Sequence, residues 1–406
     1  HLGANLFRWD ITIFDNGGIK SGRVWSEQYT IRQPDSGSYA ADMTLYYQSE
    51  DGYLYRALYK GYNGQQSTLS ADAFGIVKKD SCEPAYKSID ISDEDYELSS
   101  GKCGGSYKIF FEPPSDDLPA TATKWDGTVN WVRPSVDKPE VSGLKFTPSD
   151  EVDLQSGTIS FKLKKFIGQY EVKIDPTGQG NYEGTKVVTK VGHIKELNDP
   201  GDQLIKFDGL DKDGNKIPKD QPIKIKIQIT KGAEIHLVST NLFGRPGGIA
   251  LTRLSGENAP SSNVCWDDTD LNISQRAGDS SIETDGKTCP DSLEGVHKWQ
   301  YNATPTKSWG SHRYIDDWTY ASAKVRGTAE VSYVAEQSLQ EQVIKRGAGI
   351  GMLIGGLLIV IAVIVGIVVW MKRRRKNDSG NNLQPPTQFP PTPPSQPPTQ
   401  TPPTAF

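Results

Sequence analysis

The sequence lacks the short motifs that mark most enzyme active sites. It contains no GxSxG elbow, no HExxH motif, no P-loop and no Rossmann fingerprint. Its five histidines are scattered, and none lies in a recognisable motif. Acid pairs such as Asp116 and Asp117 leave one route to catalysis, because glycoside hydrolysis needs two carboxyl groups ~5 to 9.5 Å apart in a cleft. We therefore predict a protein without catalytic activity or cofactor, with a carbohydrate-active N-terminal domain as an alternative.

Cysteine is scarce, and its four positions form two local pairs. Cys82 and Cys103 are 21 residues apart, and Cys265 and Cys289 are 24 apart. No CxxC spacing occurs and no histidine stands at a usual ligand spacing, which argues against zinc. Such separations suit loop-closing disulfides in an oxidising compartment, each worth ~3 kcal/mol through the entropy of the unfolded chain. We predict these two disulfides from the three connectivities that four cysteines allow.

An excess of basic charge is also missing, except at the C-terminal end. The formal net charge is −5, but seven basic residues and one acid follow Glu341, which leaves a charge of −11 on the preceding part. An acidic surface does not attract nucleic acid or anionic lipid through bulk charge. The sequence therefore predicts no nucleic-acid partner.

No amphipathic helix of useful length appears before residue 325. Strand-like runs alternate with Gly, Asp, Asn and Pro, and residues 223–229 (IKIKIQI) show a strict period of two. The isoleucines of this run should face a core and Lys224, Lys226 and Gln228 should face water. We predict separate strands over 6–14, 43–47, 53–59, 107–111, 158–163, 170–174, 223–229 and 234–239. The fold class is all-β, with tandem β-sandwich modules, one transmembrane helix and a disordered tail.

Proline-rich polar stretches, including residues 133–140 (RPSVDKPE), indicate the boundaries between modules. Modules of about 100 residues have the usual size of a β-sandwich. We predict six segments in chain order: an N-terminal β domain (1–138), an Ig-like sandwich (141–232), a third β module (233–322), a stalk that can become helical (323–346), a transmembrane helix (347–371) and a cytoplasmic basic and proline-rich tail (372–406).

The only long hydrophobic run is residues 347–371, and five basic residues (372–376) follow it directly. About 20 apolar residues span a ~30 Å hydrocarbon core as a helix, and the basic end stays in the cytoplasm. Because the chain opens on His1 without a leader pattern, we expect a signal peptide to have been removed. The sequence thus predicts a single-pass protein of the cell membrane with an extracellular N-terminus. Gly347, Gly351 and Gly355 form a helix face that could pack against a second copy or another membrane protein.

Two stretches resemble bacterial surface proteins. Residues 145–163 (KFTPSDEVDLQSGTISFKL), 166–175 and 207–227 (FDGLDKDGNKIPKDQPIKIKI) resemble the Ig-like domain of flagellar hook-capping type. Asp220-Gln221-Pro222 depart from that pattern at the end of the loop. Residues 234–271 and 309–320 are similar to an adjoining β module of actinobacterial surface proteins without assigned activity. The resemblance implies an Ig-like sandwich on a bacterial, actinobacterial cell surface; residues 1–140 resemble nothing named.

Two interpretations stay open for the acidic residues beside Trp266 and Trp318. Asp267, Asp268, Asp270, Asp316 and Asp317 could converge at one end of a sandwich, and oxygen ligands in that number suit Ca²⁺. Alternatively, the acids are solvated strand ends and the tryptophans fill the core. The loop from Asp211 to Asn215 opens like an EF-hand but lacks its glycine and glutamate, so a polar turn explains it better.

The N-terminal module is dense in tyrosine, and alternate residues such as Tyr53, Tyr55 and Tyr59 should share one sheet face. Such a face either fills a core or binds sugars and proteins. We expect a surface protein that binds a protein or glycan partner outside the cell, in adhesion or recognition. The alternative is an accessory subunit held in a larger envelope assembly through its membrane helix.

Overall fold

The protein is seen in a computed structural model that describes residues 11–32, 40–64, 66–100, 102–150, 155–197, 200–240, 243–271, 286, 288–301 and 309–334. In these ranges the chain forms strands and turns and no α-helix, which confirms the all-β prediction. The described part of the chain contains no helix that is long and apolar enough to cross a membrane. The predicted membrane helix (347–371), its three glycines and the tail (372–406) lie outside the described residues.

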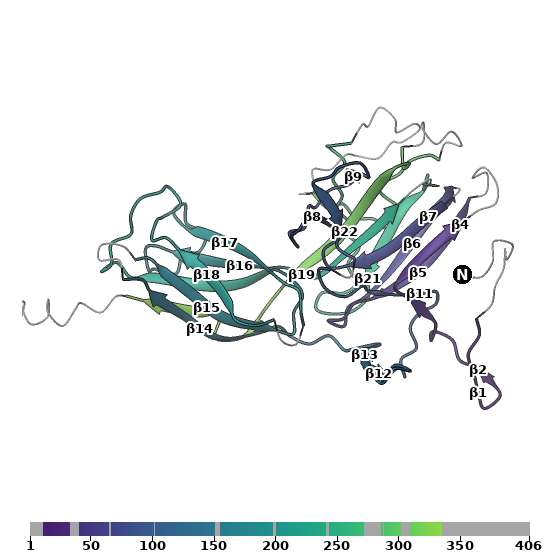
Figure 1. Ribbon diagram of the computed structural model, residues 1–406, viewed down its shortest axis with the longest axis horizontal. Helices are drawn as coiled ribbons and strands as arrows, with labels where there is room; N and C mark the ends of the chain where they lie inside the picture. Colours follow the sequence, from purple (N-terminus) through teal and green to yellow (C-terminus); the bar gives the residue numbers. More distant parts are fainter. Residues whose placement is uncertain are drawn as a thin grey trace, which may run out of the picture. The chain divides into compact units, whose positions relative to one another are not determined.

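Two hydrophobic cores divide the described residues into two lobes (Figure 1). Lobe 1 combines residues 11–136 with residues 233–322. One of its sheets has the order β20–β6–β5–β11–β3, with β21 also beside β6. The strands of this sheet are β3 (Trp25–Ser26), β5 (Ala41–Gln48), β6 (Leu54–Gly64), β11 (Lys108–Phe110), β20 (Phe243–Gly244) and β21 (Gly248–Arg253).

The second sheet of lobe 1 shares the same core with the first. It is built from β4 (Gln28–Arg32), β7 (Gln66–Asp72), β9 (Ile89–Asp90), β22 (Arg313–Ala323) and the C-terminal half of β19 (Ile223–Thr240). Tyr55 and Tyr59 of the predicted face are buried and fill the core together with Tyr47, whereas Tyr53, which is 9% exposed, lies in the same core and also lines a cleft. Three small strand pairs complete the lobe: β1 (Phe14–Asp15) with β2 (Gly18–Ile19), β8 (Ile76–Lys78) with β10 (Tyr96–Leu98), and β12 (Thr121–Thr123) with β13 (Val129–Trp131).

Lobe 2 is formed by four strands on each side of its own core. One sheet has the order β18–β15–β14–β23 and the other runs β17–β16–β19, with β24 also on β19. The strands are β14 (Glu140–Pro148), β15 (Gly157–Lys164), β16 (Gly168–Asp175), β17 (Val188–Ile194), β18 (Gln203–Phe207), β23 (Arg326–Gly327) and β24 (Glu330–Tyr333). Only the β14–β23 pair is parallel among the described strand pairs.

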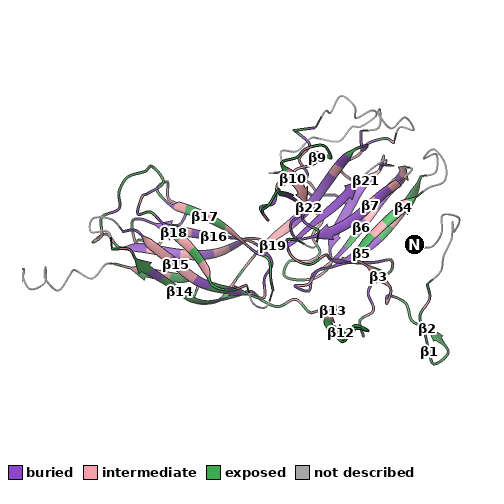
Figure 2. Ribbon diagram, viewed as in Figure 1, coloured by how far each residue is buried: buried purple, intermediate pink, exposed green. Residues whose placement is uncertain are grey.

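Strand β19 runs through both lobes. Its first half alternates buried isoleucines with half-buried polar residues, as predicted, whereas residues 232–240 are buried on both faces (Figure 2). The predicted strands 223–229 and 234–239 are therefore one strand. Its register shifts on either side of Gly232, and the glycine that looks like a strand end in the sequence marks a bulge instead.

Strand pairing also crosses the predicted segments. The predicted boundary between residues 232 and 233 falls inside β19, and β6 of the first segment pairs with β21 of the third over six residues. The predicted stalk (323–346) begins inside the fold, because β23 and β24 add to the two sheets of lobe 2. Val331 and Tyr333 pack against the core there, and four residues are too few for a clear sequence signal.

Candidate functional site

The five carboxylates predicted to converge on Ca²⁺ are divided among separate contacts in the structure. Asp267 accepts hydrogen bonds from the backbone and hydroxyl of Thr269, and Asp270 lies 2.6 Å from Lys87. Asp268, Asp316 and Asp317 are buried, but histidine and arginine engage them. Among the described residues, no group of three or more His, Cys, Asp or Glu is placed to hold a metal ion. Four of the five carboxylates thus pair with basic side chains, and Asp267 fixes a turn.

The first of these pairings is the Arg245 cluster, which comprises Arg245, Asp268, His297 and Asp317. The guanidinium of Arg245 binds both carboxylate oxygens of Asp317, at 2.6 and 2.7 Å. His297 bridges the two acids: its Nδ1 lies 2.7 Å from Asp317 and its Nε2 lies 2.8 Å from Asp268. Two acids and two bases in contact give a cluster with little net charge, which is the condition for burying it.

Aromatic rings enclose the Arg245 cluster. His297 stacks on Trp266 with a centroid distance of 5.0 Å, and Arg245 lies 4.3 Å from the centre of the Trp299 ring. Burial opposes ionisation of Asp317, but Arg245 and His297 outweigh it and lower its pKa to about 2. For His297, burial favours the neutral ring, yet the two acids raise its pKa. Both shifts favour the ionised forms of Asp317 and His297.

A second buried cluster, the His236 cluster, comprises Tyr86, Glu234, His236 and Asp316. His236 Nδ1 lies 2.8 Å from Asp316, its Nε2 lies 3.5 Å from Glu234, and the Tyr86 hydroxyl donates to Glu234 at 2.7 Å. The His236 ring also stacks on Trp318. Burial opposes the charged imidazole, but Asp316 and Glu234 raise its pKa to about 10. This cluster holds a histidinium between two acids.

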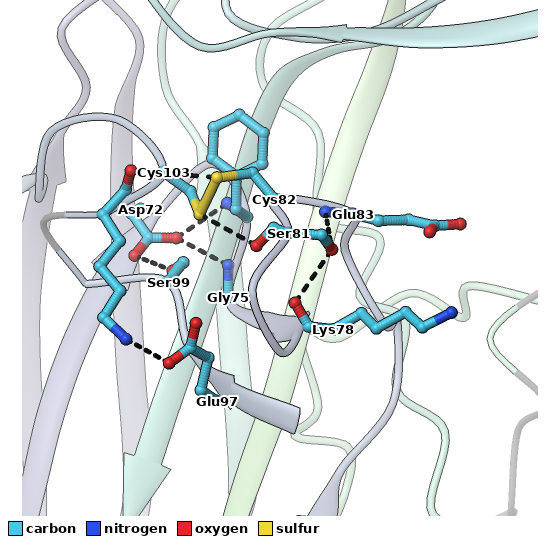
Figure 3. Close-up of a disulfide and its surroundings, with 11 residues drawn as sticks. Asp72, Gly75, Lys78, Ser81, Cys82, Glu83, Glu97, Ser99 and Cys103 are labelled. Carbon is cyan, nitrogen blue, oxygen red and sulfur yellow. Dashed lines mark hydrogen bonds and ion pairs between the residues drawn. A yellow bond between two sulfur atoms is a disulfide. The ribbon is translucent and has the colours of Figure 1, made fainter. Parts of the chain in front are cut away.

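A disulfide-bonded segment, residues 73–103, follows β7 next to the His236 cluster. Asp72, which pairs with His236 across the β7–β19 ladder, accepts hydrogen bonds from the amides of Phe74 and Gly75 and from the Ser99 hydroxyl. Figure 3 shows these bonds around the Cys82–Cys103 disulfide. Both predicted disulfides, Cys82–Cys103 and Cys265–Cys289, are present.

The ionic centres of both clusters are enclosed. The side chains of His236, Arg245, His297, Asp316 and Asp317 have no exposed surface, and none of them lines the clefts at the β1–β2 hairpin, beside Arg253, at His193 or at Asp211. A catalytic group must come within hydrogen-bond reach of the reacting atoms. The clusters therefore hold β19, β22 and the neighbouring loops together.

The β1–β2 hairpin exposes an unusual amount of apolar surface. Phe14 and Ile19 face each other across the hairpin, and each is 68% exposed. Ile11 and Ile13, just before it, are also exposed. Ile11, Ile13 and Ile19 line a cleft of about 250 Å³ together with Phe111. Exposed apolar groups that lie together, rather than singly, mark interaction sites.

The β12–β13 hairpin carries the most exposed large hydrophobic side chain of the described residues. Trp125, in its turn, is 98% exposed, and Val129 beside it is 68% exposed. Asp126 fixes the turn by accepting hydrogen bonds from the backbone and hydroxyl of Thr128, and Gly127 has a positive φ of 85°. A rigid turn thus presents the indole ring to solvent.

The loop 112–117 connects the bases of both hairpins. Arg23, shortly after β2, pairs with Asp117, and Arg133, shortly after β13, lies 2.7 Å from Asp116. Gly22 also bonds to this loop, through Glu112 and Ser115. The hairpins therefore share one support, and we call their exposed residues (Ile11, Ile13, Phe14, Ile19, Trp125 and Val129) the hairpin surface.

A buried lysine strengthens this support. The ammonium group of Lys108 in β11 lies 4.0 Å from the centre of the Trp131 ring and 5.5 Å from that of Trp25, with Glu27 at 3.8 Å. Burial lowers the pKa of Lys108, and Glu27 opposes that shift. Cation–π contacts of this kind contribute about 0.5–2 kcal/mol each. They fix β3 and β13 on β11, at the foot of the hairpin surface.

Sequence signals for both hairpins exist, although they do not by themselves indicate a binding site. Asn16 and Gly17 both have positive φ, which is the two-residue turn that an Asn-Gly pair between apolar residues specifies. Asp126 and Gly127 play a similar part in the second hairpin. Whether such turns project or pack is decided by the tertiary fold, so exposure could not be predicted from these dipeptides.

Comparison with known proteins yields no match to this chain among family models, curated proteins or solved structures. The resemblance of residues 145–229 and 234–320 to bacterial surface modules therefore stays a prediction. The observed structure supports an all-β protein of several antiparallel sheets.

Proposed function

We propose that this chain is a non-enzymatic, membrane-anchored cell-surface protein that binds a protein partner through the hairpin surface. The observation that carries the proposal is Trp125, which is almost fully exposed on a turn that its neighbours fix. A lone solvated tryptophan gains nothing for folding, because its apolar area stays in water. The same side chain contributes strongly when it is buried in an interface.

The composition of the surface favours a protein over a glycan. Ile11, Ile13 and Ile19 are aliphatic, and aliphatic side chains lack the flat face on which a sugar ring stacks. Mixed aliphatic and aromatic anchors, with a cleft beside them, match the centre of a protein interface. The partner should therefore insert an apolar side chain into the cleft of the β1–β2 hairpin.

The charges around the surface argue against a lipid bilayer as the partner. Each hairpin carries one acid and one base near its turn: Asp15 and Lys20 in the first, Asp126 and Lys124 in the second. Binding to anionic lipid requires a cluster of basic residues instead. Placement outside the cell rests on the predicted membrane helix and agrees with the two disulfides, which form in oxidising compartments.

Site-directed photo-crosslinking in cells that display the full chain tests this proposal. A photoreactive residue at position 125 should capture one defined protein, and the same group at position 204 should not. Leu204 is a matched control because it is 66% exposed on β18 of lobe 2.

Affinity measured with the captured protein completes the test. Trp125→Ala should weaken binding by about 30-fold, the effect of a 2 kcal/mol hot spot, and Leu204→Ala should leave it unchanged. Melting temperatures should stay the same in both variants because both side chains are solvated. Equal capture from positions 125 and 204, or full affinity of the Trp125→Ala protein, would refute the hairpin surface as the binding site.

A further inference from the structure

A second cleft, of about 250 Å³, lies at the end of lobe 1 where the chain passes toward lobe 2. It shares no residue with the hairpin surface. Its walls come from Tyr53 just before β6, the segment 136–139, Ala233 of β19, the loop after β21 and the end of β22. Tyr53, Val136, Pro139, Ala233, Ala321 and Ala323 form its apolar part. The charged residues at the cleft are Arg253, Lys138, Lys324, Asp137 and Glu257.

Arg253 is the key residue of this cleft. Only 4% of it is exposed, yet no carboxylate of the described residues lies within ion-pair distance of its guanidinium. Its nitrogens donate instead to the backbone carbonyls of Ser255 and Glu257, at 2.6 and 3.0 Å. Buried arginines normally have an anionic partner, as Arg245 has in Asp317, because an uncompensated buried charge is costly.

The two lysines at the cleft add to this imbalance. Neither Lys138 nor Lys324 lies within ion-pair distance of a carboxylate in the described chain, whereas Asp137 is 3.4 Å from Lys165 and so is already engaged. Three cations thus surround the cleft with Glu257 as the acid left to oppose them. This local positive charge contrasts with the formal charge of −11 on the chain up to Glu341. An anion that enters the cleft would balance it.

We propose that this cleft binds the carboxylate of a small organic acid. The guanidinium of Arg253 has five N–H donors, of which two bind the loop carbonyls, and the remaining planar donors suit a carboxylate, with Lys138 and Lys324 also at the cleft. The apolar wall of Tyr53 and the three alanines receives the carbon body of the ligand. The cleft, of about 250 Å³, has room for a carbon body the size of one amino acid or one small ring. The ligand is then either a free acid or the C-terminal residue of a peptide.

Titration of the full-length protein with benzoate tests the proposal, and benzamide is the neutral control of the same shape. We expect saturable benzoate binding with Kd of about 1 mM, as suits a ligand with one charged anchor, and at least tenfold weaker binding of benzamide. N-acetyl-leucine and a short peptide ending in leucine distinguish the two sources of the carboxylate. Tighter binding of the peptide, lost on C-terminal amidation, identifies a chain terminus, and equal binding identifies a free acid.

Variants locate the site. Lys138→Ala with Lys324→Ala should weaken benzoate binding about tenfold, and Lys145→Ala with Lys206→Ala, which removes the same charge from lobe 2, should not. Arg253→Lys keeps the charge but loses the planar donors, so it should weaken binding further. If that protein fails to fold because Arg253 fastens the loop 255–257, the lysine pairs still decide the question. Equal binding of benzoate and benzamide, or no effect of the Lys138 and Lys324 changes, overturns the proposal.

Discussion

Asp316 and Asp317 are neighbours in β22, but their side chains enter different buried clusters. Asp316 lies 2.8 Å from His236, and Asp317 lies 2.6 Å from Arg245. Successive side chains of a strand point to opposite faces of a sheet. One acidic dipeptide therefore fixes both faces of the central sheet of lobe 1: the face beside the disulfide-bonded segment and the face toward the sheet of β5, β6 and β11.

Removal of the Asp317 charge should destabilise the protein strongly. The change Asp317→Asn leaves Arg245 and His297 facing only Asp268, so a positive charge becomes uncompensated in the core. Breaking a buried pair in this way costs about 3–5 kcal/mol. Urea denaturation followed by tryptophan fluorescence measures the change, since Trp266, Trp299 and Trp309 surround the cluster.

Asp116→Asn is the matched control for that measurement. The same change removes one carboxylate charge, but the Asp116 side chain is 98% exposed in its pair with Arg133. Exposed pairs contribute about 0–1 kcal/mol. Comparable losses of stability in the two variants would contradict the prediction, because they would show that losing a buried ion-pair partner costs no more than losing an exposed one.

Stability should fall as the solution becomes alkaline because of His236. The pKa of His236 is raised to about 10 in the folded protein, above its ordinary value of 6.5. The folded state therefore holds this proton more tightly, and the resulting stability is fully present below pH 6.5 and lost as the pH rises toward 10. Unfolding free energies measured from pH 6 to pH 10 should decrease, and the slope should be smaller in His236→Gln.

Asp51 should produce a separate decrease at lower pH. Burial raises its pKa from 3.8 to about 7, although the Ser49 hydroxyl opposes that shift. Ionising this acid is harder in the folded state, so stability falls as the pH rises from 3.8 to about 7. Asp51→Asn should flatten the curve in this window and leave the alkaline decrease caused by His236 in place. An unchanged curve below pH 7 would contradict this assignment.

The sequence predicts local features of the fold better than its long-range pairings. The alternation of Ile223 to Ile229 identifies a strand and its buried face because that pattern is local. The sequence does not show that the same strand continues past Gly232. Glycine usually indicates the end of a strand, but here the strand accommodates it in a bulge and goes on. The union of residues 11–136 with 233–322 depends on β7 and β21, whose partners are far away in the chain.

The same distinction holds for the charged residues. Trp266 and Trp318 beside acidic runs suggest the core, and both are buried. The partners of those acids are not predictable, because Arg245 and Asp317 are 72 residues apart and no motif joins them. The sequence shows five carboxylates and suggests oxygen ligands for a cation, whereas the fold pairs four of them with basic side chains of the same chain and uses Asp267 in a turn.

Gly75 should tolerate no side chain, because it lies against the His236 cluster. Its φ is +61°, and a Cβ atom there would come within 2.5 Å of His236 Nδ1 and 2.7 Å of Asp316 Oδ2. Gly127 has a similar φ of +85° but nothing within 4 Å of its Cβ position. Both Ala variants suffer the strain of a positive φ, of order 1 kcal/mol, but only Gly75→Ala must also displace a buried ion pair.

Thermal and urea unfolding should therefore show a loss of about 1 kcal/mol for Gly127→Ala and a loss several times larger, or failure to fold, for Gly75→Ala. Equal losses in the two variants would mean that the segment 73–103 moves away from His236 at little cost, and that the cluster does not depend on this contact.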